Sequence, residues 1–146
     1  TSASSDGSIE ISGGTLRITA SGDGIDANGS VLISGGYTIV SGPAQGDTAT
    51  LDYDTTAEIT GGIFVGTGAS GMAQTFSDSE QGVIMVSTGS QTGGTAVTIA
   101  DQEGNEIFAW TPQLDFATVI FSSPDVTSGQ AYTLTAGTVS VYTEAK

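Results

Sequence analysis

The chain has no cysteine, no histidine and almost no basic side chains. It has 16 acidic residues and only two basic ones, Arg17 and Lys146, which gives a formal net charge of −14 over 146 residues. Without cysteine or histidine, disulfide, thiolate and imidazole chemistry are excluded. The excess of negative charge repels a polyanion, so nucleic acid is excluded as a direct partner. No apolar run approaches the ~20 residues that a membrane-spanning helix needs, so we expect no membrane span.

Glycine, in contrast, is plentiful: the chain contains 22 Gly but only 3 Pro and 1 Trp. Serine and threonine are abundant as well. This composition favours short strands and tight corners, so we expect an all-β fold with almost no α-helix. The chain begins with Thr1 rather than methionine, which predicts a mature or excised segment.

The apolar residues of the first half of the chain recur at equivalent positions of an internal repeat. Three segments superpose, and they begin about 22 and then about 26 residues apart: Ile9–Leu16, Val31–Thr38 and Ala57–Phe64. Each has an alternating apolar run, a Gly-Gly step and a second alternating run, while Ile25 and Leu51 align between them. Such a period is typical of stacked units that cannot bury their own apolar faces. The sequence therefore predicts a parallel β-helix, or solenoid, over residues 1–81.

From Gly82 the repeat disappears and longer alternating runs follow, separated by turn signals such as Asp101–Asn105 and Ser123–Asp125. This pattern predicts antiparallel strands. Because an open solenoid end offers unpaired backbone groups, we interpret residues 82–146 as a β-sandwich-like cap on it. The N-terminal end shows no such cover, so the first turn is a candidate surface for self-association.

Several motifs carry a family resemblance. The run from Ile11–Gly14 through Gly22–Ser30 to Ile33–Gly36 resembles the bacterial surface family described as carbohydrate-binding domain-containing proteins. Gly71–Ala73 and Ser122–Pro124 resemble the C-terminal half of that family. The resemblance implies a right-handed parallel β-helix with an extracellular or cell-surface location. It also implies that the protein holds calcium and binds plant-wall polysaccharide, including acidic, pectin-like polymers.

Acidic residues between the repeated segments form a candidate metal site. Asp26 aligns with Asp52 of the next unit, and equivalent residues of neighbouring parallel strands lie about 4.8 Å apart. Like charges at this distance raise a pKa or bind a counter-ion, and oxygen ligands suit a hard cation, so we predict Ca²⁺. The predicted ligands are Asp6, Asp23, Asp26, Asn28, Asp52 and Asp54. The alternative is that these residues are turn formers whose side chains cap local backbone, which explains the alignment of the two aspartates less well.

Two tyrosines are candidates for sugar contact. Tyr37 and Tyr53 are out of phase with the inward rows, and an exposed ring gives the C–H face of a sugar an apolar platform. An isolated surface tyrosine is equally ordinary, and both interpretations stay open. We expect Phe108 and Trp110, which share one strand face, to belong to the core of the C-terminal half.

Two catalytic functions are alternatives to binding. Arg17 is a candidate proton-abstracting base of a pectin lyase, but it is the only basic residue inside the repeat, and no lysine or histidine there stabilises the developing charge. The aspartates of the candidate metal site also suit a polysaccharide hydrolase, whose carboxylates lie roughly 5–10 Å apart. Residues that hold calcium are not available for this chemistry, so we expect that the protein is not an enzyme.

These observations favour a non-catalytic, calcium-stabilised, extracellular protein that binds polysaccharide. Calcium would neutralise the aspartates and bridge to the carboxylates of uronate glycans, which reconciles the net charge of −14 with an acidic ligand. The alternative is structural: a subunit of a surface filament or adhesin stalk that assembles head-to-tail through its uncovered N-terminal turn.

Overall fold

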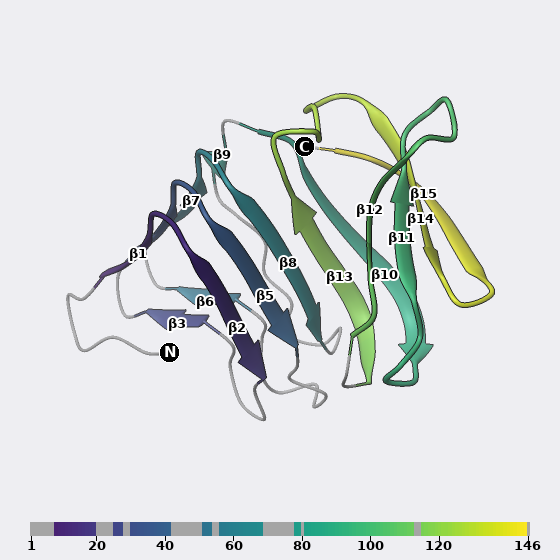
Figure 1. Cartoon of the computed structure of the whole chain (residues 1–146), viewed down its shortest axis with the longest axis horizontal. Helices are drawn as coiled ribbons and strands as arrows, with labels where there is room; N and C mark the ends of the chain where they lie inside the picture. Colours follow the sequence, from purple (N-terminus) through teal and green to yellow (C-terminus); the bar gives the residue numbers. More distant parts are fainter. Residues whose placement is uncertain are drawn as a thin grey trace.

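The structure, a computed structural model, describes residues 8–19, 25–27, 30–41, 51–53, 56–68, 78–79, 81–112 and 115–145. These residues form strands and no helix, so the all-β prediction is confirmed. The strands make three layered sheets, which we call the first, central and outer sheets, and one further strand pair (Figure 1).

The first sheet contains the opening strand of each repeat. Its strands lie parallel in the order β1 (Ser8–Ile11), β4 (Ser30–Ile33), β7 (Thr56–Ile59) and β9 (Asp78–Ser79). Ile11 is paired with Ile33, and Ile33 with Ile59, and all three side chains are buried. The register predicted from the repeat is therefore confirmed.

The central sheet contains the second strand of each repeat. Strands β2 (Thr15–Thr19), β5 (Tyr37–Ser41) and β8 (Ile63–Gly68) are parallel, with Leu16, Thr38 and Phe64 in one row. Two strands of the non-repetitive half extend the same sheet: β13 (Phe116–Ser122) pairs antiparallel with β8, and β10 (Val83–Gln91) pairs antiparallel with β13. Figure 1 shows this sheet running from purple β2 to teal β10.

The remaining strands form the outer sheet and the short pair. The outer sheet is antiparallel, in the order β12 (Glu106–Trp110), β11 (Val97–Ala100), β14 (Ala131–Ala136) and β15 (Val139–Glu144). The short pair joins β3 (Ile25–Ala27) and β6 (Leu51–Tyr53) in parallel.

The central sheet is covered on both faces. Phe64 belongs to a core with Ile33 and Ile59 of the first sheet. The next residue, Val65, belongs to a second core with Ile99 of the outer sheet. Since successive residues of a strand point to opposite faces, β8 serves both cores at once. The run of five buried positions at its end reflects this double burial.

The prediction of a right-handed parallel β-helix with a C-terminal antiparallel β-sandwich-like cap is wrong. In the described part of the chain no sheet closes or forms a solenoid, and the central sheet mixes parallel with antiparallel strands. The physical reason is that β13 hydrogen-bonds to the free edge of β8 and continues the sheet of the repeats, instead of covering their end as a separate module. The predicted division into residues 1–81 and 82–146 stays a prediction, and the central sheet runs across it.

The Gly-Gly corners of the repeats pack directly on one another. A Cβ atom on Gly35 would lie 2.7 Å from the carbonyl oxygen of Ser12, and one on Gly61 would lie 2.7 Å from that of Ser34. Both distances are too short for a side chain, so glycine is required there. The second glycine of each corner has a φ of 76° or 81°, which residues with a side chain rarely adopt.

The stack of corners ends at Gln81. Within the stack, the N–H of Ile63 donates to the carbonyl oxygen of Gly36 at 2.9 Å. At the equivalent carbonyl of Gly62, the donor is the Nε2 of Gln81, also at 2.9 Å. The same amide donates to the hydroxyl of Ser122 on β13. A side chain thus takes the place of the backbone of a further repeat.

Candidate functional site

The predicted metal ligands fall mainly outside the described residues. Asp26 and Asp52 are Cα partners in the pair β3–β6, as their alignment predicted. The other predicted ligands, Asp6, Asp23, Asn28 and Asp54, lie outside the described residues. No group of three or more Asp, Glu, His or Cys that could hold a metal ion occurs within the described ranges. Calcium binding therefore stays a prediction, supported by one pair of aspartate positions.

Tyr37 lies between the central and outer sheets. Its side chain is half-buried, and its ring lies 5.9 Å from that of Phe108 on β12, tilted by 52°. Burial raises the pKa of Tyr37 above its usual 10.0, and the positive charge of Arg17 opposes this shift. The side chain of Tyr53 lies outside the described residues, and sugar binding by either tyrosine stays a prediction.

Phe108 is the centre of an aromatic cluster under the outer sheet. Its ring lies 4.8 Å from that of Phe121 and 5.7 Å from that of Trp110. These residues belong to or pack against the second core, so the expected core role of Phe108 and Trp110 is confirmed.

The face of the outer sheet that points away from the second core carries one large apolar side chain among the described residues. Along β14, Tyr132 and Leu134 point into the core, which leaves Thr133 and Thr135 on this outer face. Tyr142 is paired with Thr133, and 73% of its surface is exposed. The rest of the face has small side chains and two exposed glutamates: Thr98, Ala100, Ala109, Ala131, Ser140, Glu106 and Glu144.

Sequence reasoning missed Tyr142, although a signal was present. Val139 and Val141 alternate with Ser140 and Tyr142, and a period of two places the valines and the tyrosine on opposite faces. The alternation therefore indicates an outward tyrosine once the strand is known to cover a core.

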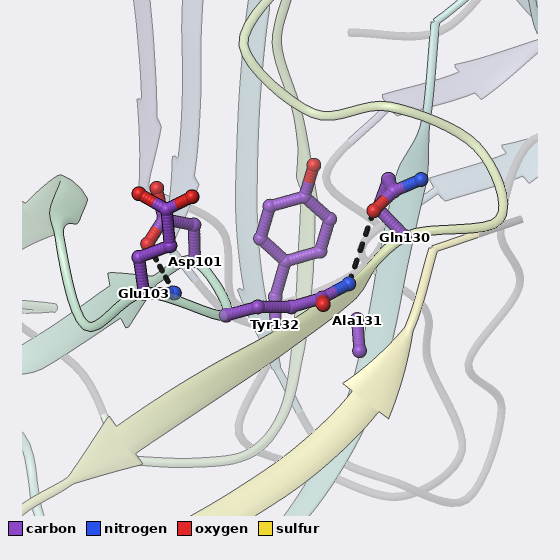
Figure 2. Close-up of a pocket in the computed structure, with 6 residues that line it drawn as sticks. Asp101, Glu103, Gln130, Ala131 and Tyr132 are labelled. Atoms are coloured by element: carbon purple, nitrogen blue, oxygen red, sulfur yellow. Dashed lines mark hydrogen bonds between the residues drawn. The ribbon is translucent and has the colours of Figure 1, made fainter.

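A hollow of about 220 Å³ lies where β11 ends and β14 begins. Figure 2 shows the side chains of Asp101, Glu103, Gln130 and Tyr132 pointing to the same side of the backbone there. The complete lining is Asp101, Gln102, Glu103, Gln130, Ala131 and Tyr132. No basic side chain lines it, so the hollow suits a neutral or cationic group better than an anion.

Hydrogen bonds fix the loop on one side of the hollow. Asp101 Oδ1 accepts from the N–H groups of Glu103 and Asn105, at 2.9 Å each, and Oδ2 accepts from the Asn105 side chain at 3.3 Å. The backbone bond from Asn105 is the main cause that lowers the pKa of Asp101 below its usual 3.8. This carboxylate therefore holds the turn together.

Two amides join the sides of the hollow. Gln102 Nε2 donates to Gln130 Oε1 at 3.0 Å. Within the described residues, the Gln102 Oε1 acceptor and the Gln130 Nε2 donors have no hydrogen-bond partner. Tyr132, at the base, is held because its hydroxyl accepts from the N–H of Thr127 at 2.8 Å. The arrangement offers a donor and an acceptor side by side, as hydroxyl groups of a sugar require.

In the described ranges no helix is long and apolar enough to cross a lipid bilayer. Comparison with models of protein families, with curated proteins and with solved structures finds no match for this chain. The resemblance to carbohydrate-binding domain-containing proteins therefore stays a prediction.

Proposed function

We propose that the protein is a non-catalytic polysaccharide-binding protein that uses the outer face of the outer sheet and the hollow at its end. The observation that carries the proposal is Tyr142, which is 73% exposed on the outer face of the outer sheet. An exposed aromatic ring stacks on the C–H face of a sugar and keeps its hydroxyl for hydrogen bonding. Its small neighbours Thr133 and Ser140 leave room for a sugar beside the ring.

The hollow is a second, polar contact of the proposed site, at the end of the same sheet. Its side chains point to the same side of β14 as Tyr132, which is the opposite side from Thr133 and its partner Tyr142 (Figure 2). A sugar chain that used both contacts would therefore pass around the end of the sheet.

An acidic glycan requires an ion in addition. A net charge of −14 repels uronates unless a cation lies between the two surfaces. The pairing of Asp26 with Asp52 supports a calcium ion at β3–β6, where the ion would lower the repulsion between the two aspartates and bind a uronate at a contact separate from the outer sheet (Figure 1). We propose an extracellular or cell-surface location for this activity, as the family resemblance implies.

The filament alternative has less support. Head-to-tail growth needs two open ends. At the downstream end, however, β13 pairs with the edge of β8, and the Gln81 side chain donates to the carbonyl oxygen of Gly62. A further copy would have to displace both.

The test compares Tyr142→Ala with Met85→Ala, the other large apolar side chain that is exposed among the described residues. Affinity electrophoresis against soluble cellulose derivatives and polygalacturonate, with calcium or with chelator, measures binding. Loss of the ring should weaken binding about tenfold, since aromatic stacking contributes ~1–1.5 kcal/mol, and Met85→Ala should bind like the unmodified chain.

Three outcomes would contradict the proposal. Equal binding by Tyr142→Ala would remove the outer face as the site. Unchanged polygalacturonate binding in chelator would remove the calcium bridge. Release of reducing ends from either polymer would show that the protein is an enzyme.

A further inference from the structure

The first repeat forms an open edge at one end of the molecule. β1 is the terminal strand of the first sheet and β2 is a terminal strand of the central sheet, and Figure 1 shows both at the same end. Among the described residues, no strand pairs with the outer side of either. Ile11 is 9% exposed, whereas Ile33 and Ile59 are fully buried in the same row. The edge therefore offers unpaired backbone groups and part of an apolar row.

The Gly13-Gly14 corner fits a further backbone. Gly35 and Gly61 each approach the preceding corner so closely that a Cβ atom would lie 2.7 Å from a carbonyl oxygen. At Gly13, the first equivalent position, nothing among the described residues lies within 4 Å of such an atom. At Gly35 and Gly61, the space beside the glycine is filled by the backbone of the preceding repeat. At Gly13 the same space is open among the described residues.

Two backbone donors complete the fit. In the second repeat, the N–H of Ser34 donates to Ile11 at 2.9 Å and that of Tyr37 donates to Gly14 at 2.8 Å. In the first repeat the equivalent donors are the N–H groups of Ser12 and Thr15, which lie at the edge. They are spaced to meet two carbonyl oxygens of a corner that stacks in the same way.

We propose that this edge binds an extended strand–Gly-Gly–strand segment of another polypeptide, the same kind of unit as residues 30–41. The bound segment lies parallel to β1 and β2, its corner rests on Gly13, and its carbonyl oxygens accept from Ser12 and Thr15. It extends both sheets and covers Ile11, so that the interface between successive repeats continues by one unit.

A second folded copy of this chain does not fit the edge. Its downstream corner, the only one with the right polarity, is occupied by Gln81, and β13 covers its last repeat strand. Two upstream edges that face each other run antiparallel, and their corners do not stack. The partner is therefore a repeat segment that is free of such a cover.

The experiment uses a fluorescent synthetic peptide with the sequence of residues 30–41, a scrambled peptide of the same composition, and the full chain. Fluorescence anisotropy should show binding of the repeat peptide but not of the scrambled one. Gly13→Val, which fills the open space, should weaken binding about tenfold or more because overpacking costs about 1–3 kcal/mol. Ser140→Val on the outer sheet is the matched control and should bind like the unmodified chain.

Thermal unfolding of each variant separates lost binding from lost structure. Gly13→Val should unfold at the temperature of the unmodified chain. If its Tm is lower, Gly13→Ala, which adds a single methyl group, replaces it in the binding measurement. Equal binding of both peptides would overturn the proposal, as would unchanged binding by a folded Gly13 variant. So would sedimentation showing a dimer of the chain that a Gly13 variant dissociates, because the occupant would then be a second copy.

Discussion

Alanine at Gly35 and alanine at Gly13 should change stability in opposite directions, although the two glycines hold the same place in the repeat. At Gly35 the new methyl group would lie 2.7 Å from the carbonyl oxygen of Ser12 and 3.4 Å from its carbonyl carbon. At Gly13 nothing among the described residues lies within 4 Å. The contrast isolates the stacking of the corners from the local preference for glycine.

The magnitude follows from two opposing terms. Alanine restricts the unfolded chain more than glycine does, which stabilises a compatible site by about 0.5–1 kcal/mol. This term acts in both variants, because neither position has a positive φ. Relief of the contact at Gly35 requires the first and second repeats to separate, and overpacking of this kind costs about 1–3 kcal/mol. Gly35→Ala should thus lose up to about 2.5 kcal/mol while Gly13→Ala gains about 0.5–1 kcal/mol.

Urea unfolding followed by far-ultraviolet circular dichroism measures both values. For a domain of this size, 1 kcal/mol corresponds to about 4 °C in Tm, so thermal unfolding provides a second measurement. Gly61→Ala is a replicate, because its methyl group would meet the carbonyl oxygen of Ser34 at the same 2.7 Å. If Gly13→Ala and Gly35→Ala shifted the midpoint equally, direct stacking of the corners would be refuted.

Three other substitutions test single groups. Gln81→Ala removes two hydrogen bonds of 2.9 Å from the end of the stack and should cost about 1–3 kcal/mol in urea unfolding, whereas the exposed Gln102→Ala should cost under about 0.5 kcal/mol. Thr38→Val removes a buried hydroxyl that has no partner in the described structure and should leave Tm unchanged or higher; the control Thr88→Val loses a hydrogen bond and should lower it. Because the pKa of Asp101 is lowered in the folded state, its carboxylate stabilises the fold above the unfolded value of 3.8, and this contribution is lost as the pH falls through the folded pKa. Asp101→Asn should therefore lose less Tm than the unmodified chain between about pH 5 and about pH 2, and an equal loss would contradict this role.

The repeat predicts the register of the parallel strands because equivalent residues have equivalent places. Ile11, Ile33 and Ile59 align in the sequence and are paired in the structure. A one-residue slip would move each isoleucine from the core to the other face of the sheet, so burial fixes the pairing strongly. Local pattern is sufficient here because the neighbours are successive copies of one unit.

The same reasoning fails for the strand that follows the last repeat. Phe116–Ser122 is an apolar strand that is buried at all but one position, and nothing in its sequence states which edge it joins. The structure pairs it antiparallel with β8, across a separation of about fifty residues, and a mixed central sheet results where we predicted a separate cap. The pattern also predicts that Tyr37 points away from the core of the repeats. It does not predict the contact of its ring with Phe108, because that contact depends on the position of the outer sheet.

The two ends of the repeat stack differ for a reason that also lies outside the repeat. Gln81 follows the last unit and has no counterpart at the other corners, yet its amide replaces the backbone donor of a further unit at Gly62. It reaches that position because it also donates to Ser122, which itself donates to the carbonyl oxygen of Gly82 at 2.7 Å. Growth of the stack is therefore blocked at the downstream end by a network that includes β13. At the upstream end, nothing among the described residues lies within 4 Å of a Cβ atom on Gly13, and the proposed binding of one more repeat segment rests on this difference between the two ends.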